Sequence, residues 1–114
     1  MILMIGGAYQ GKKDLALQMA DGREELVFPD VQEYIREKLS EGQSPDKIEE
    51  TLTAEAFRLP GRILTADEIG NGIVPMEAFD REYRELTGRL LCRLAKEAET
   101  VYRVIAGIPI KIKG

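Results

Sequence analysis

The stretch Met1–Lys13, MILMIGGAYQGKK, places five apolar residues directly before a glycine-rich segment that ends in two lysines. The apolar run Met1–Ile5 predicts a buried strand of a parallel sheet. The segment Gly6–Lys13 follows the phosphate-loop pattern G-x-x-x-x-G-K-[ST], except that Lys13 stands where a serine or threonine is usual. That pattern needs a helix after the loop, and Lys12–Ala20 carries apolar residues at helical spacing. The start of the chain therefore predicts a strand, a phosphate loop and a helix in succession.

A phosphate loop binds anions because its backbone N–H groups line a concave turn at the positive end of a helix. We expect Lys12 to reach the β- and γ-phosphates of ATP or GTP. The serine or threonine hydroxyl that is missing at position 13 normally ligates Mg²⁺, and a protonated lysine cannot replace it. If Mg²⁺ accompanies the nucleotide, it must therefore bind without this ligand. The alternative is an ordinary glycine-rich turn that binds nothing. The predicted nucleotide-binding residues are Gly6, Gly7, Ala8, Tyr9, Gln10, Gly11, Lys12 and Lys13.

Strands and helices alternate along the rest of the chain. This alternation predicts an α/β fold, with a P-loop-type parallel sheet flanked by helices, in one reduced domain over residues 1–114. Asp30 and Ser44 are expected to cap helices, and Gly88 inside the last helix predicts a close packing contact. The expected strands are Glu25–Phe28, Arg62–Ala66, Val101–Ala106 and an extended end at Gly107–Lys113, and the further helices are Val31–Ser40, Ser44 to about Phe57, and Met76–Ala98.

A second part of the site is expected where the strand Arg62–Ala66 ends. Asp67 and Glu68 follow this strand directly. Ligands of parallel sheets gather at the carboxyl ends of strands, so Asp67 or Glu68 is expected to position a metal or a substrate hydroxyl. Together with Lys12 these two carboxylates are the candidate catalytic residues. The alternative is that they end the strand in solvent.

Composition limits the function. The net charge of −4 gives no electrostatic case for binding nucleic acid or an anionic membrane. A single cysteine, Cys92, excludes an internal disulfide, and with no signal peptide or spanning segment evident we expect a cytoplasmic protein. Histidine is absent, which excludes histidine catalysis and, with a single cysteine, makes a zinc site unexpected; no residue is assigned as a direct metal ligand.

Residues 67–75 read DEIGNGIVP, directly after the predicted strand Arg62–Ala66. This segment resembles the signature NEVGxGIVP of the adenosylcobinamide kinase / adenosylcobinamide-phosphate guanylyltransferase family. Arg81 with residues 83–86, YREL, and 88–90, GRL, is similar to the family helix R-x-F-R-D-L-x-G-R-L. Residues 101–109, VYRVIAGIP, are similar to its V-Y-x-V-V-A-G-I-P ending, and the first loop resembles its GGARSGKS.

The resemblance implies a nucleotide-binding P-loop protein of cobalamin biosynthesis. Family members phosphorylate adenosylcobinamide, a corrinoid precursor, then transfer GMP to the product through a histidine, and they assemble as trimers. The likeness therefore implies a homo-oligomer, a trimer, with nucleotide and corrinoid partners. It also implies that Gly70 and Gly72 allow a ligand to approach the backbone. Arg81 and Arg84 would contact phosphate or corrinoid, or else form a salt-bridged helix face.

Several departures leave two hypotheses open. Without histidine, the family's guanylyl relay cannot run in this sequence. The middle segment 25–57 is short, acidic and helical. It lacks both the histidine that carries GMP in the family and the family's strand that ends in V-D-C-L-T. We interpret this segment as either a subunit interface or a substitute lid. Asp67 replaces the family's asparagine. The chain is thus expected to be a nucleotide-dependent corrinoid kinase or a catalytically inactive accessory or regulatory binding subunit.

Overall fold

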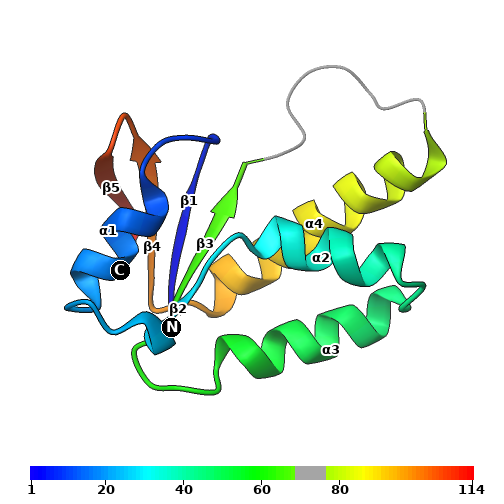
Figure 1. Cartoon of the computed structure of the whole chain (residues 1–114), viewed down its shortest axis with the longest axis horizontal. Coiled ribbons are helices and arrows are strands. Elements are labelled where there is room, and N and C mark those ends of the chain that lie inside the picture. Colours follow the sequence, from blue (N-terminus) through cyan, green and yellow to red (C-terminus); the bar gives the residue numbers. More distant parts are fainter. Residues whose placement is uncertain (69–76) are drawn as a thin grey trace.

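A five-stranded sheet with helices on both faces forms the protein, which the computed structural model describes over residues 1–68 and 77–114 (Figure 1). This arrangement confirms the predicted α/β class. Most boundaries lie within two residues of the expected ones. The elements are β1 (Ile2–Gly6), α1 (Lys12–Met19), the 3-10 helix η1 (Glu24–Leu26), β2 (Val27–Phe28), α2 (Val31–Ser40), α3 (Pro45–Ala56), β3 (Ile63–Asp67), α4 (Ala78–Glu97), β4 (Thr100–Ile105) and β5 (Ile108–Lys113).

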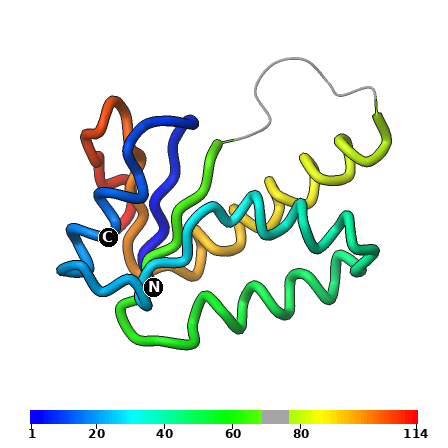
Figure 2. The backbone as a smooth tube through the Cα atoms, viewed as in Figure 1, coloured from blue at the N-terminus to red at the C-terminus, as the bar shows by residue number. Residues whose placement is uncertain are grey.

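The sheet has the strand order β2-β3-β1-β4-β5, which puts β1 at its centre. β1 runs parallel to both neighbours, and Gly6 is the register partner of Asp67 in β3 and of Val104 in β4. The β1–α1 connection and the end of β3 therefore lie at the same edge of the sheet (Figure 2). This is the edge where ligands of parallel sheets bind.

The predicted parallel sheet is confirmed for β2, β3, β1 and β4, and the tail strand β5 adds to it by pairing antiparallel with β4. The reason is the turn Ala106-Gly107, where both residues have positive φ angles, 51° and 76°. Positive φ at both central residues is typical of tight hairpin turns, which reverse the chain between adjacent strands. A short hairpin thus replaces the crossover helix that a parallel strand would need.

Two apolar clusters hold the helices against the sheet. α1 covers one face, where Ala16 and Ala20 pack with Met4 and Val104. The other face is covered by α2, α3 and α4 (Figure 1). Its buried side chains include Leu3, Val31, Ile35, Ile48, Leu52, Leu64, Leu86, Leu90 and Leu94. The middle segment 25–57, which contains α2 and α3, therefore contributes buried side chains to the hydrophobic core on this face of the sheet.

The two predicted helix caps and the predicted strand Glu25–Phe28 are confirmed only in part. Ser44 caps α3 as expected, because its side chain accepts a hydrogen bond from the Lys47 N–H at 3.2 Å. Asp30 precedes α2 as expected but is left-handed, with φ 56°, and its side chain makes no cap hydrogen bond. The predicted strand Glu25–Phe28 is reduced to Val27–Phe28, since Glu24–Leu26 forms a 3-10 turn.

The packing contact expected at Gly88 is absent from the described residues. A Cβ built on Gly88 meets no atom of residues 1–68 or 77–114 within 4 Å, apart from its chain neighbours and its own helix backbone.

The length and apolar character of the helices decide whether any of them could span a membrane. Within the same ranges, no helix combines the length and the apolar character that crossing a bilayer requires.

Candidate functional site

The glycine loop joins β1 to α1 and begins at a glycine that the fold requires. A Cβ on Gly6 would lie 2.5 Å from the backbone oxygen of Val104, so no larger residue fits there without a backbone shift. Gly11 precedes α1 with φ 81°, the left-handed region that favours glycine. Gly11 offers no side-chain cap, and the first N–H groups of α1 therefore open onto the loop.

Lys12 is folded back under this loop. Its side chain is 6% exposed, and its ammonium group donates to the carbonyl oxygens of Gly7 at 2.6 Å and Gly6 at 3.2 Å. A third contact joins Lys12 Nζ to Asp67 Oδ1 at 2.8 Å. The structure therefore brings together two of the three predicted catalytic residues, Lys12 and Asp67, in an ion pair.

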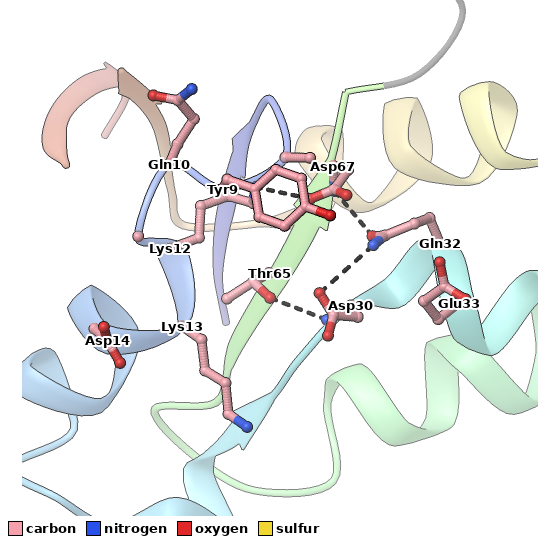
Figure 3. Close-up of a pocket in the computed structure, with 12 residues that line it drawn as sticks. Tyr9, Gln10, Lys12, Lys13, Asp14, Asp30, Gln32, Glu33, Thr65 and Asp67 are labelled. Atoms are coloured by element: carbon pink, nitrogen blue, oxygen red, sulfur yellow. Dashed lines mark hydrogen bonds and ion pairs between the residues drawn. The ribbon is translucent and has the colours of Figure 1, made fainter. Parts of the chain in front are cut away.

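A short chain of hydrogen bonds fixes Asp67 from the side of α2 (Figure 3). The backbone N–H of Asp67 donates to Gln32 Oε1 at 2.9 Å, and Gln32 Nε2 lies 3.5 Å from Asp30 Oδ1. The backbone N–H of Asp30 donates to Thr65 Oγ1 at 3.0 Å. Gln32 and Thr65 are buried, at 4% and 1% exposure, so both polar side chains are held in place inside the protein.

These groups surround a cavity of about 340 Å³ that opens beside the loop. Two lysines, Lys12 and Lys13, face four carboxylates there, which leaves the lining with a formal charge of −2. No group of three or more side chains suited to a metal ion occurs in residues 1–68 and 77–114. The described lining residues are Ala8, Tyr9, Gln10, Gly11, Lys12, Lys13, Asp14, Asp30, Gln32, Glu33, Thr65 and Asp67.

The loop is also tied to the β4–β5 hairpin. Gln10 Oε1 accepts a hydrogen bond from the backbone N–H of Ala106 at 2.5 Å, and a Cβ on Gly11 would lie 3.8 Å from Gly107 Cα. Tyr9, the residue before Gln10, has φ 61° and a fully exposed side chain beside the cavity. The hairpin thus supports the loop from the side opposite α2.

Glu68 is separated from the other candidate catalytic residues. Its carboxylate forms a two-point ion pair with Arg103 on β4, at 2.8 and 3.2 Å, and it does not line the cavity. Arg81 and Arg84 lie in the first turns of α4 and are likewise not among the lining residues. Gly70 and Gly72 lie outside the described residues.

The pKa of Tyr83 on α4 depends on charged residues of the cavity. Burial raises the pKa of the Tyr83 phenol above its usual value, and the carboxylates of Glu33 and Asp67 raise it further, while Arg36 opposes them. Arg36 lies over the Tyr83 ring, 5.0 Å from its centroid. Tyr83 therefore belongs to the electrostatic surroundings of the cavity.

Five polar residues of the site were missed as site residues by sequence reasoning: Asp14, Asp30, Gln32, Glu33 and Thr65. A weak signal was available for Thr65, which lies two positions before Asp67 on the same strand and therefore on the same face. Asp30 was expected only as a helix cap. Gln32 and Glu33 resemble any polar residues at the start of a helix, and their role depends on where α2 packs against β3.

Comparison with known proteins places these features in a family. A family model described as cobinamide kinase / cobinamide phosphate guanyltransferase matches residues 29–112. The match includes the middle segment 25–57 from residue 29 onward, where the sequence analysis found no family motif. It begins after the glycine loop, so the nucleotide-binding role of that loop stays a prediction.

Curated relatives are similar over parts of their length. The bifunctional adenosylcobalamin biosynthesis protein CobU of Salmonella typhimurium is 41% identical over 63 residues, which cover 54% of this chain and 35% of the relative. CobU of Escherichia coli is 38% identical over 65 residues, 56% of this chain and 36% of the relative. The bifunctional protein CobP of Pseudomonas aeruginosa is 37% identical over 73 residues, 63% of this chain and 42% of the relative.

The matched regions thus span between about a third and two fifths of the relatives' length. The family model, by contrast, covers most of the 114 residues, from the end of β2 to β5. The chain therefore belongs to the cobinamide kinase / cobinamide phosphate guanyltransferase family.

Proposed function

We propose that this chain binds the phosphates of ATP or GTP on the loop Gly6–Lys13 and acts in cobalamin biosynthesis, as a nucleotide-dependent kinase of a corrinoid precursor. The observation that carries the proposal is the pairing of Lys12 with Asp67 at the carboxyl edge of the sheet, beside the uncapped start of α1. A buried ammonium group, free backbone N–H groups and a carboxylate are the parts that phosphoryl transfer uses. The family membership supports a corrinoid as the substrate.

Each residue has a distinct role in this proposal. The backbone of Gly7 to Gly11 would cradle the phosphates, and Lys12 would neutralise the charge that develops during transfer. Asp67, when it leaves Lys12, would accept the proton of the attacking substrate hydroxyl. Lys13, whose side chain is exposed on the first turn of α1, would add a second positive charge to the entrance of the cavity.

Magnesium does not fit the described residues as a protein-held ion. Lys13 occupies the position that usually offers a hydroxyl ligand, Asp67 is engaged by Lys12, and the described residues contain no three-ligand cluster. We therefore derive no step through a metal. Guanylyl transfer by a histidine relay is not part of the proposal, because the 114 residues contain no histidine.

A second function is favoured by the same observations. The occupied Lys12 and the lysine at position 13 fit a binding subunit without turnover, which would regulate or assist a full-length partner. Formation of a homo-oligomer, a trimer in the family, belongs to both proposals. The two differ only in whether bound nucleotide is consumed.

The test is calorimetric titration with ATP and with GTP, with and without Mg²⁺, on the natural chain and on Lys12→Ala. Lys47→Ala is the matched control, since Lys47 is an exposed lysine on α3 that does not line the cavity. We expect micromolar binding that Lys12→Ala weakens at least tenfold and Lys47→Ala leaves unchanged. Absence of binding to either nucleotide would overturn both proposals.

Turnover separates the two candidates. With cobinamide as acceptor, the kinase forms ADP or GDP at a rate that depends on cobinamide and on Lys12. Binding without cobinamide-dependent turnover would overturn the kinase proposal and support the binding subunit.

A further inference from the structure

The Lys12 ammonium group is contacted by three oxygens. Its N–H donors bond to Gly7 O at 2.6 Å and to Gly6 O at 3.2 Å, and Asp67 Oδ1 lies 2.8 Å from Nζ as its ion-pair partner. A phosphate that approaches Lys12 must compete with one of these three oxygens. The two carbonyl groups belong to the loop backbone, which leaves the Asp67 side chain as the group that can move.

Asp67 is held in its present direction by a buried amide. Gln32 Oε1 accepts from the backbone N–H of Asp67 at 2.9 Å, and Gln32 itself is 4% exposed. Its Nε2 group faces Asp30 Oδ1, and Asp30 is anchored on Thr65. The end of β3 is thus fixed to the first turn of α2, while the Asp67 carboxylate stays 28% exposed at the cavity.

We propose that Gln32 is a positioning residue that aims Asp67 at Lys12, so that the Asp67 carboxylate competes with incoming phosphate for the ammonium group. The inference rests on the proposed function, because it concerns the same site. Displacement leaves Asp67 without its partner and next to an anion, in a cavity whose lining already carries an excess of two carboxylates over lysines. The Lys12–Asp67 pair therefore opposes the binding of a polyphosphate to Lys12.

The experiment measures binding of inorganic tripolyphosphate in EDTA by calorimetry, for the natural chain and for Asp67→Asn. Asp67→Asn removes the competing charge at constant size, and the affinity for metal-free tripolyphosphate should rise roughly tenfold. Asp14→Asn is the charge-matched control, because Asp14 lines the same cavity without contacting Lys12. It should change the affinity by less than about threefold, as expected for one partly screened charge.

Gln32 is tested through its dependence on Asp67. Gln32→Met keeps the volume and removes both hydrogen bonds, so it should raise the affinity in the natural background and have no further effect in Asp67→Asn. Gln32→Glu keeps the acceptor for the Asp67 N–H and should produce no rise. Circular dichroism confirms folding, and Gln32→Ala replaces the methionine variant if that variant does not fold.

The failures are distinguishable. Absence of tripolyphosphate binding in every variant would overturn the proposed function together with the inference. Binding that Lys12→Ala abolishes, but that Asp67→Asn changes no more than Asp14→Asn does, would overturn the inference alone. Equal effects of Gln32→Met with and without the Asp67 carboxylate would show that Gln32 stabilises the fold without aiming Asp67.

Discussion

Gly6 and Val104 lie so close together that a methyl group on Gly6 would meet the Val104 carbonyl oxygen at 2.5 Å. This contact joins the last residue of the central strand to its neighbour β4, immediately below the loop. Gly6→Ala must therefore push two backbones apart. We expect it to lower the free energy of unfolding by about 2 kcal/mol or more, measured by urea denaturation. An alanine variant as stable as the natural chain would contradict the close packing.

Gly88 provides the opposite case within the same chain. It lies inside α4, and a Cβ there meets no described atom within 4 Å beyond its neighbours and its own helix. Gly88→Ala should raise the free energy of unfolding by about 1 kcal/mol, because alanine restricts the unfolded chain and favours the helix. The same urea titration measures it. A loss of stability would show that Gly88 packs against something other than residues 1–68 and 77–114, such as a second subunit.

Arg62 is a buried cation with incomplete hydrogen bonding. Its guanidinium lies 5.5 Å from the Phe28 ring centroid and pairs with Glu55 at 3.2 Å, while Nε and Nη1 have no partner in the described part of the chain. Arg62→Met keeps most of the volume and removes these unsatisfied donors. We expect its free energy of unfolding to equal or exceed that of the natural chain.

Arg62→Ala is the comparison that isolates packing. It leaves a cavity beside Phe28 and should lower the free energy of unfolding by about 2 kcal/mol. Guanidinium chloride or thermal unfolding of both variants measures the difference. If the methionine variant loses as much stability as the alanine variant, the charge of Arg62 matters more than its packing.

Tyr83 makes stability depend on alkaline pH. Its pKa is raised in the folded protein, first by burial and then by Glu33 and Asp67, so the folded state favours the neutral phenol. A raised pKa contributes stability below the unfolded value of 10.0, and this contribution is lost as the pH rises through the folded pKa. The free energy of unfolding should fall above about pH 10, and by less in Tyr83→Phe.

Absorbance titration of the phenol provides the direct check. Asp67→Asn removes one of the charges that raise the pKa, so it should move the Tyr83 titration to lower pH. An unchanged titration in that variant would show that Asp67 is not felt at Tyr83.

Gln10 should govern how firmly the loop is held. Its hydrogen bond to the Ala106 N–H is its contact with the β4–β5 turn, so Gln10→Ala should speed hydrogen exchange at Ala106. Exchange in the core of β1, at Leu3 and Met4, should stay slow because those residues are fully buried. Equal exchange at Ala106 in both proteins would contradict the tie.

Sequence reasoning reached the strand–loop–helix order at Gly6–Lys13 because glycine and apolar patterns are local properties of the chain. It could not reach the Lys12–Asp67 pair, which depends on the register that sets Gly6 opposite Asp67. The separation of Glu68 was within reach, since Glu68 directly follows β3 in extended pairing with Gly6, and successive residues of extended chain point to opposite faces. Arg103, its partner, lies 35 positions away, and that distance hides the pairing from any local pattern.

The role of Gln32 was hidden for a different reason. An amide at the start of a helix of mixed charge carries no pattern of its own, and only the packing of α2 against β3 makes it a hydrogen-bond acceptor for Asp67. The antiparallel β5 was similarly hidden, because alanine is not a typical turn residue and nothing in the sequence indicates that Ala106 adopts a left-handed φ of 51°. Both features arise where tertiary contacts override local preference.

The position of β1 has a consequence for the order in which the sheet forms. Among the five described strands β1 is synthesised first, yet its two neighbours are residues 63–67 and 100–105. Closing such long loops is slow and entropically costly, so β1 pairs only after both partners have been made. The loop Gly6–Lys13, which begins at the last residue of β1, is therefore among the last parts of the described chain to acquire its folded shape during synthesis.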